Sequence, residues 1–337
     1  MKKTFHYCLL TFLLLGITTG FAQKKLAQTG FQFLSVGTHA RATGMAEAFN
    51  TIEGTSAALF YNPAGLAGIP DLVDVSLNQM KWIADISYIS GSLALNYNQG
   101  RYGVFGISFM TVNYGEFLWT RVADNEQGFE DVQGWPEPGA YAIGLGYARQ
   151  LSDRFSVGGQ VKYVNQNLGK SFVPVYADAF ADTVVDIEEK THKLGTMAYD
   201  FGTLYRTGFR SLVFGMSVRN FSQEIKFEKE GFQLPLTFRI GASMNLLDFL
   251  PDQSSQHVLI LSFDAVHPRS FPEYINIGSE YIFMDMLMLR AGYVSNHDDY
   301  NFSTGFGLRK LGLALDFSYT PFSIFDDISR VSVNFSF

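Results

Sequence analysis

Side chains able to do acid–base or nucleophilic chemistry are few and scattered in this chain of 337 residues. Five histidines lie beyond the N-terminal leader: His39, His192, His257, His267 and His297. A hydrolase would need one of them beside a serine, or a cluster of carboxylates with histidine, and no such motif is recognisable. His267 precedes Pro268 at the end of an apolar stretch, where a structural turn explains it better. The sequence therefore predicts that the protein is not an enzyme.

Acidic clusters between the apolar stretches suggest a second kind of chemistry, calcium binding. They comprise Asp124, Glu126, Glu130 and Asp131, then Asp182, Asp186, Glu188 and Glu189, then Asp298-Asp299 and Asp326-Asp327. Calcium favours several oxygen ligands on a flexible loop, but none of these spacings matches a known calcium loop. Solvated loops explain the clusters better. We expect no metal site and no cofactor, and loop calcium binding stays open.

The composition excludes several further classes of function. The single cysteine, Cys8, lies in the leader, so a mature chain would lack disulfides, thiolate metal sites and cysteine nucleophiles. The formal charge of -7 argues against nucleic-acid binding. Two glycine pairs, Gly144-x-Gly146 and Gly305-x-Gly307, lack the strand-to-helix context of a nucleotide site, and glycines that thin a sheet explain them better.

The C-terminal residues carry the strongest structural signal. Within the stretch from Ser329 to Phe337, apolar residues occupy every odd position from Val331 on and polar residues every even position, and the sequence ends on an aromatic ring. A terminal strand with one apolar, lipid-facing side and one polar side is typical of an outer-membrane β-barrel. Phe335 and Phe337 are therefore predicted to form the signal that the barrel assembly machinery recognises.

The same alternation predicts about fourteen strands along residues 70–337. The predicted strands cover residues 70–79, 84–98, 101–113, 139–150, 153–168, 194–206, 210–220, 235–247, 256–266, 273–283, 286–295, 300–309, 311–320 and 329–337. Short links alternate with long ones, the latter at roughly 114–138, 169–193, 221–234 and 321–328, which is the pattern of periplasmic turns and external loops. The link at 248–255 is too long for this pattern. A secreted β-sandwich or solenoid would also alternate, but would need neither this loop pattern nor the terminal Phe.

The alternation also assigns faces. Leu311, Leu313 and Leu315 are predicted to face lipid, opposite Gly312, Ala314 and Asp316. The charged residues of the strands thereby fall on the lumen side, because each would cost a few kcal/mol at the bilayer midplane. They are Lys162, Arg219, Arg239, Asp316 and Arg330. An internal ion-pair network explains them better than a selectivity filter.

The N-terminal residues divide into two predicted segments. Residues 1–22 have a basic start, an apolar core and small residues before Gln23, as a cleaved signal peptide does. Residues 23–69 are rich in Ala and Gly without period-two alternation, which favours short helices that plug the lumen. Within them, the turn Asn62, Pro63, Ala64 and Gly65 is predicted to anchor this plug or hatch, as a structural element or a gate. Pro63 fixes its own φ, Asn62 can bond backbone groups, and Gly65 permits close approach.

These segments resemble a known family. The motifs that carry the resemblance are Gly37-Thr38-His39-Ala40-Arg41-Ala42-Thr43-Gly44-Met45, Ala57-Ala58-Leu59-Phe60-Tyr61-Asn62-Pro63-Ala64-Gly65-Leu66-Ala67, Asp153-Arg154-Phe155-Ser156-Val157-Gly158-Gly159, Asp200-Phe201-Gly202-Thr203-Leu204-Tyr205, Leu234-Pro235-Leu236-Thr237-Phe238-Arg239 and Asp264-Ala265-Val266-His267-Pro268. They are similar to the PorV/PorQ family, relatives of the FadL-type transporters. Where that family usually has Gly-Gly, this chain has Ala46-Glu47.

The resemblance implies a FadL-like outer-membrane barrel with an N-terminal hatch, kin to components of type IX secretion. Two functions follow from it. In one, the barrel binds secreted cargo proteins or docks beside a translocon; in the other, it is a channel for small hydrophobic molecules. Its expected partners are outer-membrane lipid, the assembly machinery and, in the first case, secretion proteins. The expected location is the outer membrane of a Gram-negative cell.

Overall fold

The computed structural model of the protein describes residues 29–116, 119–122, 126–131, 138–176, 184–227, 230–250, 256–297, 300–323 and 326–337. The predicted signal peptide, residues 1–22, lies outside these ranges, as do the acidic residues Asp124, Asp182, Asp298 and Asp299. Among the helices of the described ranges, none combines the length and the apolar character needed to cross a membrane.

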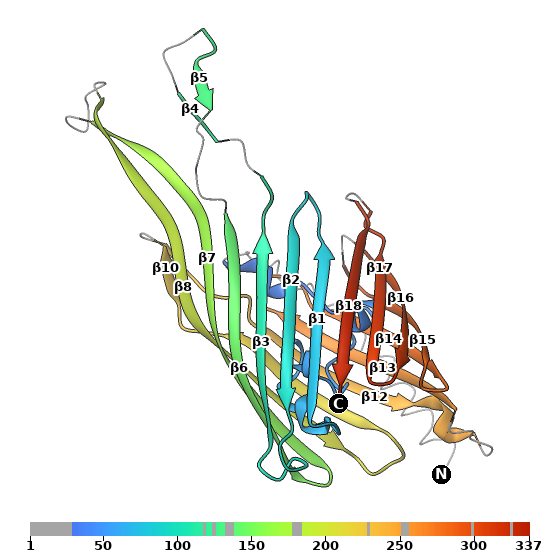
Figure 1. The fold of residues 1–337 in the computed structure, drawn as a ribbon. Coiled ribbons are helices and arrows are strands. Elements are labelled where there is room, and N and C mark those ends of the chain that lie inside the picture. The colour runs from blue at the N-terminus through green and yellow to red at the C-terminus, as the bar shows by residue number, and fades with distance from the viewer. Residues whose placement is uncertain are drawn as a thin grey trace, which may run out of the picture.

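Fourteen antiparallel strands form a closed barrel (Figure 1). In order round the barrel they are β1 (Val73–Lys81), β2 (Ser87–Leu95), β3 (Val104–Asn113), β6 (Gly139–Ser152), β7 (Phe155–Tyr176), β8 (Val184–Arg206), β9 (Val213–Phe221), β12 (Thr237–Asn245), β13 (His257–Pro268), β14 (Tyr274–Phe283), β15 (Leu287–Val294), β16 (Phe302–Lys310), β17 (Leu313–Thr320) and β18 (Ile328–Ser336). β18 pairs with β1 and closes the barrel, with Phe335 opposite Val75. The predicted architecture is confirmed.

Each strand turns an apolar face outward. In β3 the exposed residues include Phe105, Ile107 and Phe109, while Gly106 and Ser108 between them are buried inside the barrel. Such period-two burial is what lipid outside and a filled lumen inside impose on one strand. The protein is accordingly an outer-membrane β-barrel.

The longest connections lie at one end of the barrel, although both ends have short ones. We call the end with residues 96–103, 153–154, 207–212, 284–286 and 311–312 the turn end, and the opposite end the loop end. The long turn-end link after β12 contains a 3-10 helix, η4 (Leu246–Phe249). Asn245 caps this helix by accepting from the Leu247 N–H, and Asp248 accepts from the Ser211 N–H at 3.1 Å. The link therefore has structure of its own and is held against the neighbouring turn.

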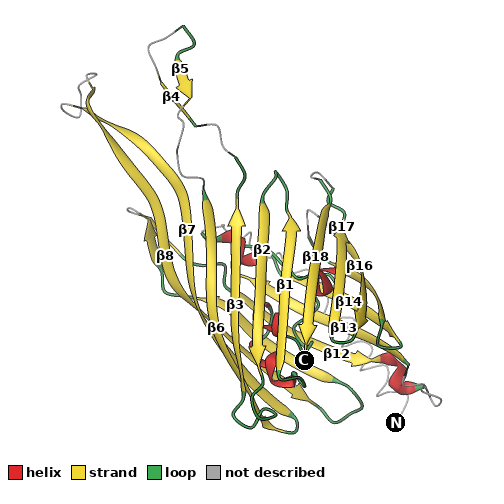
Figure 2. Cartoon of the chain, in the orientation of Figure 1, coloured by secondary structure: helices red, strands yellow, loops and turns green. Residues whose placement is uncertain are grey.

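Two predictions about strand limits are wrong. Residues 169–193 were expected to form a loop, but β7 and β8 continue far past the other strands as a paired ribbon (Figure 2). Past Asn167, β7 no longer pairs with β6, so the ribbon is not part of the closed wall that imposes alternation on the other strands. Leu311 was expected to face lipid within a strand; it lies in a turn with φ 51 and is 93% exposed, so β17 begins two residues later, at Leu313.

The loop end also carries two small hairpins inside connections that were predicted to be long loops. One joins β4 (Thr120–Val122) to β5 (Phe129–Asp131), and the other joins β10 (Ile225–Phe227) to β11 (Glu230–Phe232). With the β7–β8 ribbon, these hairpins make the loop end the more elaborate end of the molecule (Figure 1).

The N-terminal segment fills the lumen as a helical hatch, as predicted. We call its described part, residues 29–69, the plug; it contains η1 (Gln32–Ser35), α2 (Ala40–Gly44), η2 (Ser56–Phe60) and η3 (Pro63–Gly68) (Figure 2). It starts at the loop end, where Thr29 pairs with Gln233. β1 begins at the turn end, so the plug passes through the lumen from one end to the other.

Candidate functional site: the plugged lumen and the cavity above it

Glycines on the inner face of the wall bring the plug backbone into contact with the sheet. A Cβ on Gly158 would lie 2.5 Å from the Ala64 nitrogen, and one on Gly292 would lie 2.3 Å from the Ala46 nitrogen. A side chain at either position would displace the plug, since real Cβ atoms do not approach that closely. Some of the chain's glycines are therefore needed so that the plug can pack closely against the wall.

The predicted hatch turn is buried against the wall. Asn62 Oδ1 accepts from the Ala64 N–H at 3.1 Å and caps η3, which Pro63 begins. Asn62 Nδ2 donates to the Asn50 carbonyl at 2.8 Å and to the Thr203 carbonyl of β8 at 3.2 Å. One amide therefore links two parts of the plug to the barrel. Whether this turn anchors or gates the plug stays a prediction.

Ala46 and Glu47, which stand where the family usually has Gly-Gly, both lie in the left-handed region, with φ of 52 and 59. Glycine adopts this conformation without penalty, whereas another residue costs about 1 kcal/mol. At Glu47, contacts with the barrel wall offset this conformational cost. Arg239 Nη2 lies 2.8 Å from its carboxylate, and Arg239 Nη1 donates to its backbone carbonyl at 3.0 Å.

A second group of ion pairs fixes α2. Arg41 of the plug contacts Glu280 at 2.6 Å, Glu280 contacts Arg290 at 2.7 Å, and Arg290 contacts Asp316 at 2.7 Å. All four side chains are buried, or nearly so, between plug and wall. Buried charges are tolerated when each is paired, and breaking one pair leaves the other charge uncompensated.

A further pair lies within the wall on the opposite side. Lys162 of β7 contacts Asp200 of β8 at 2.7 Å and donates to Asn220 Oδ1. Nearer the turn end, Arg206 pairs with Glu53 of the plug. The charged residues predicted to face the lumen thus lie inside the barrel, and three of the five, Lys162, Arg239 and Asp316, take part in ion pairs.

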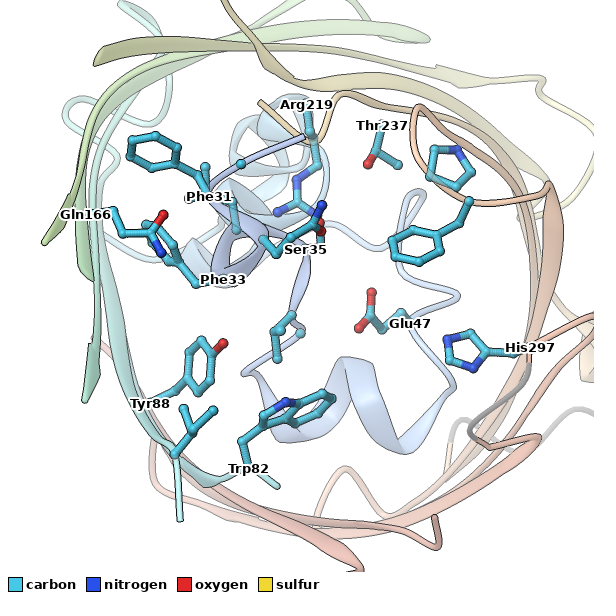
Figure 3. A pocket seen from close by; sticks show the side chains of 18 of the residues that line it. Phe31, Phe33, Ser35, Glu47, Trp82, Tyr88, Gln166, Arg219, Thr237 and His297 are labelled. Carbon is cyan, nitrogen blue, oxygen red and sulfur yellow. The ribbon is translucent and has the colours of Figure 1, made fainter. Parts of the chain in front are cut away.

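Above the plug, the loop end of the lumen holds a cavity of about 1370 Å³. Figure 3 shows how the plug contributes Phe31, Phe33 and Ser35, while Trp82 and Tyr88 come from the wall on one side. More of its lining is aromatic: Tyr114, Phe227, Phe232, Phe271, Tyr300 and Phe322. Large, mostly apolar cavities with a few polar groups are the usual form of a ligand site.

The buried charged residues of the cavity are three arginines and one glutamate. Arg239 and Glu47 pair with each other, as described above. Arg219 and Arg330 also line the cavity, and Figure 3 shows the Arg219 side chain reaching inward. Their side chains were predicted to face the lumen, but the cavity itself was not predicted, because its lining comes from plug, strands and loops that are far apart in sequence.

Burial also determines the charge of a plug histidine. His39 is 1% exposed, and its Nε2 lies 3.2 Å from Asn334 Oδ1. Removal from water lowers the pKa of His39 to about 4, so the ring is neutral at physiological pH.

Of the remaining histidines, His192, His267 and His297 lie near the loop end, and His257 lies near the turn end. His192 Nε2 lies 2.6 Å from Ser171 Oγ on the β7–β8 ribbon, and His297 packs on Tyr300. His257 Nδ1 lies 2.7 Å from the Tyr281 hydroxyl, and His267 lies 2.9 Å from Glu273. Within the described ranges no three His, Cys, Asp or Glu side chains gather as a metal site would require.

The predicted assembly residues lie at the strand that closes the barrel. Phe335 and Phe337 are exposed on the outer face, with ring centroids 5.2 Å apart. Phe337 and Val73 exchange backbone hydrogen bonds of 2.9 and 3.0 Å, so the last residue is paired with the first strand. Recognition of these rings by the assembly machinery stays a prediction.

Together these features define a class: an outer-membrane β-barrel with an internal plug and a cavity at its loop end. A family model described as "Type IX secretion system protein PorV" matches residues 20–265, which is well over half of the chain. The chain belongs to this family, and the resemblance inferred from its motifs is confirmed. A search of curated proteins found no match.

Solved structures share the fold at low sequence identity. The toluene transporter TbuX of Ralstonia pickettii has a TM-score of 0.57 at 12% identity over 89% of this chain and 98% of its own. The toluene transporter TodX of P. putida gives 0.55 and 12% over 89% and 99%. A Pseudomonas aeruginosa FadL homologue gives 0.52 and 11% over 90% and 99%. These likenesses establish a FadL-like fold.

Proposed function

We propose that this protein serves type IX secretion as a receptor that binds client proteins at its loop end. The family membership supports the pathway. The observation that carries the receptor role is the arrangement of the lumen: a cavity open at the loop end lies above a plug held to the wall by buried ion pairs. A site closed on one side suits binding better than passage.

The loop end also offers a docking surface outside the cavity. The β7–β8 ribbon extends both strands past Asn167, where the pairing with β6 ends. Past Asn167, the described strand pairing of β7 is with β8 alone, so an extended segment of another chain could add to the edge of the ribbon. In outer-membrane barrels long connections face outward, so this ribbon would meet clients on the cell surface.

A secretion assay tests the proposal. A strain lacking the protein is complemented with the wild type or with a variant in which a short turn replaces residues 170–190. We expect the variant to form a normal heat-modifiable barrel while clients of the secretion system accumulate inside the cells. Arg309→Gln, which alters only the exposed turn-end pair with Asp285, is the control. Normal secretion by the shortened variant would contradict a receptor role for the ribbon.

The orientation can be checked separately by labelling. A cysteine at the exposed Gln127 should react with an impermeant maleimide on intact cells, and one at Ser152 only after lysis. The reverse pattern would place the loop end in the periplasm and exclude the receptor proposal.

A second function, passage of small hydrophobic molecules, is favoured by the aromatic lining of the cavity. Cells lacking the protein would then take up a labelled monoaromatic hydrocarbon more slowly, with secretion unchanged. Unchanged uptake together with blocked secretion would exclude this alternative.

A further inference from the structure

Most buried cations inside the barrel contact a carboxylate, but two cations that line the cavity do not. Arg41 and Arg290 share Glu280 and Asp316, Lys162 has Asp200, and Arg239 has Glu47. In the described ranges Arg219 and Arg330 have no carboxylate partner. A buried cation without a carboxylate in contact is costly, so an anion in the cavity would stabilise these two arginines.

Arg219 is the less satisfied of the two. It is 8% exposed, and its Nε has no hydrogen-bond partner among the described residues. Its guanidinium lies 5.8 Å from the ring centre of Tyr61, and that of Arg239 lies 6.0 Å from the same ring. Two guanidinium groups therefore lie near one ring. Of the nearby carboxylates, Glu47 contacts Arg239 and Asp200 contacts Lys162.

Arg330 adds positive charge to the cavity from the other wall. Its Nε donates to the Gly37 carbonyl at 2.9 Å and its Nη1 to Thr320 Oγ1 at 3.0 Å, both neutral groups. The guanidinium also stacks 5.8 Å from the Trp82 ring. These contacts hold Arg330 in place without neutralising it. Glu230, the other acidic residue of the lining, is exposed.

The rest of the cavity lining indicates what kind of molecule would carry the anion. Its volume exceeds the roughly 300–1,000 Å³ of ordinary small-molecule sites. Besides its apolar rings, the lining has side chains of a kind that can hydrogen-bond a peptide backbone, namely Gln166, Thr237, Asn276 and Asn296. At the mouth, Gly30 already donates from an extended backbone to the Gln233 carbonyl at 3.2 Å. The cavity thus has the size and bonding groups for an apolar peptide.

From these observations we propose that the cavity binds an apolar peptide segment that carries a carboxylate, and that Arg219 binds this carboxylate. Arg330 contributes a favourable potential. Planar guanidinium groups bind carboxylates through two parallel hydrogen bonds, which gives both strength and orientation. The inference rests on the proposed function, because a secreted client is the source of such a segment.

The test uses the full-length barrel in a non-ionic detergent and three fluorescent probes. The first is a short peptide of apolar and aromatic residues with a free C-terminal carboxylate, the second is the same peptide with a C-terminal amide, and the third is a twelve-carbon fatty acid. We expect the acid peptide to bind about tenfold more tightly than the amide, as loss of one charge-assisted contact predicts.

Variants then locate the anion. Arg219→Gln should remove the preference for the acid peptide, and Arg219→Lys should retain part of it. Arg309→Gln, an identical substitution at an exposed turn-end residue, should leave the preference unchanged. Heat-modifiable migration verifies that each variant forms a barrel. If Arg219→Gln does not fold, the comparison of the acid and amide peptides on the wild type still decides whether the cavity prefers a carboxylate.

Equal binding of the acid and amide peptides would overturn the proposal. Binding of the fatty acid through Arg219 without binding of the acid peptide would also overturn it, and would assign the cavity to a lipid. If the acid preference is found but secretion does not depend on the protein, the carboxylate site stands and the proposed function fails.

Discussion

At the scale of single residues, the plug shows how a departure from a family pattern is accommodated. Ala46 and Glu47 adopt a backbone conformation suited to glycine, and the Glu47 carboxylate reaches Arg239 of the wall. The strain at Glu47 is thereby offset by contacts that a glycine could not make. Ala46 has no polar contact through its side chain, so its strain is not offset in this way.

Ala46→Gly should therefore stabilise the plug, by about 1 kcal/mol, because the strain disappears without loss of the Glu47 ion pair. The measurement is the midpoint of urea unfolding in detergent. Ala48→Gly is the matched control, since Ala48 is equally buried but is not among the residues with positive φ. It should lower the midpoint. A lower midpoint for Ala46→Gly as well would mean that packing of the Ala46 methyl outweighs the strain.

His39 should make stability depend on pH. Its pKa is about 4 in the folded protein and 6.5 when exposed, so the unfolded chain binds the proton more readily. Stability should be unaffected above the unfolded pKa and fall as pH drops from 6.5 to 4, by about 3 kcal/mol at most. His39→Gln should flatten this part of the profile of urea midpoint against pH. An unchanged slope in His39→Gln would exclude His39 as the cause.

At the scale of elements, most strands could be predicted from sequence because lipid and lumen impose alternation on every membrane-spanning residue. The prediction of strand limits failed where this constraint ends. It failed in the parts of β7 and β8 that extend past the other strands, and at Leu311, which lies in a turn. The cavity could not be predicted at all. Arg219 was predicted to face the lumen, but its lack of a carboxylate partner depends on the contact of Asp200 with Lys162, which follows from three-dimensional packing.

The terminal strand carries a prediction at this scale. Deleting Phe337, or changing Phe335 to Asp, should sharply reduce heat-modifiable barrel in outer-membrane fractions, because β18 must be recognised and then pair with β1. Leu311→Asp, at a fully exposed turn residue, should be tolerated. Normal barrel levels after deletion of Phe337 would show that the terminal ring is dispensable.

At the scale of the whole molecule, the barrel and its plug have different structural roles. Fourteen strands form the wall, and a segment of mostly small residues closes the space inside it. The inner glycines leave room for that segment and would leave a passage in its absence.

Deleting residues 37–65 should leave a folded barrel that conducts ions in planar bilayers, since the inner side chains alone would not fill a barrel of this size. Single-channel recording against the wild type is the measurement. Deleting residues 119–131, the β4–β5 hairpin outside the lumen, should not increase conductance. A folded but non-conducting 37–65 deletion would show that the plug is not what closes the lumen.

The path of the plug has a topological consequence. Thr29 lies at the loop end and Val73 at the turn end, so the chain is threaded through the ring that its own later strands complete. Pairing of β18 with β1 therefore completes a ring around an earlier segment of the same chain. The plug is thus covalently joined to the wall at the turn end, and at the loop end it is held to the rim by the pairing of Thr29 with Gln233.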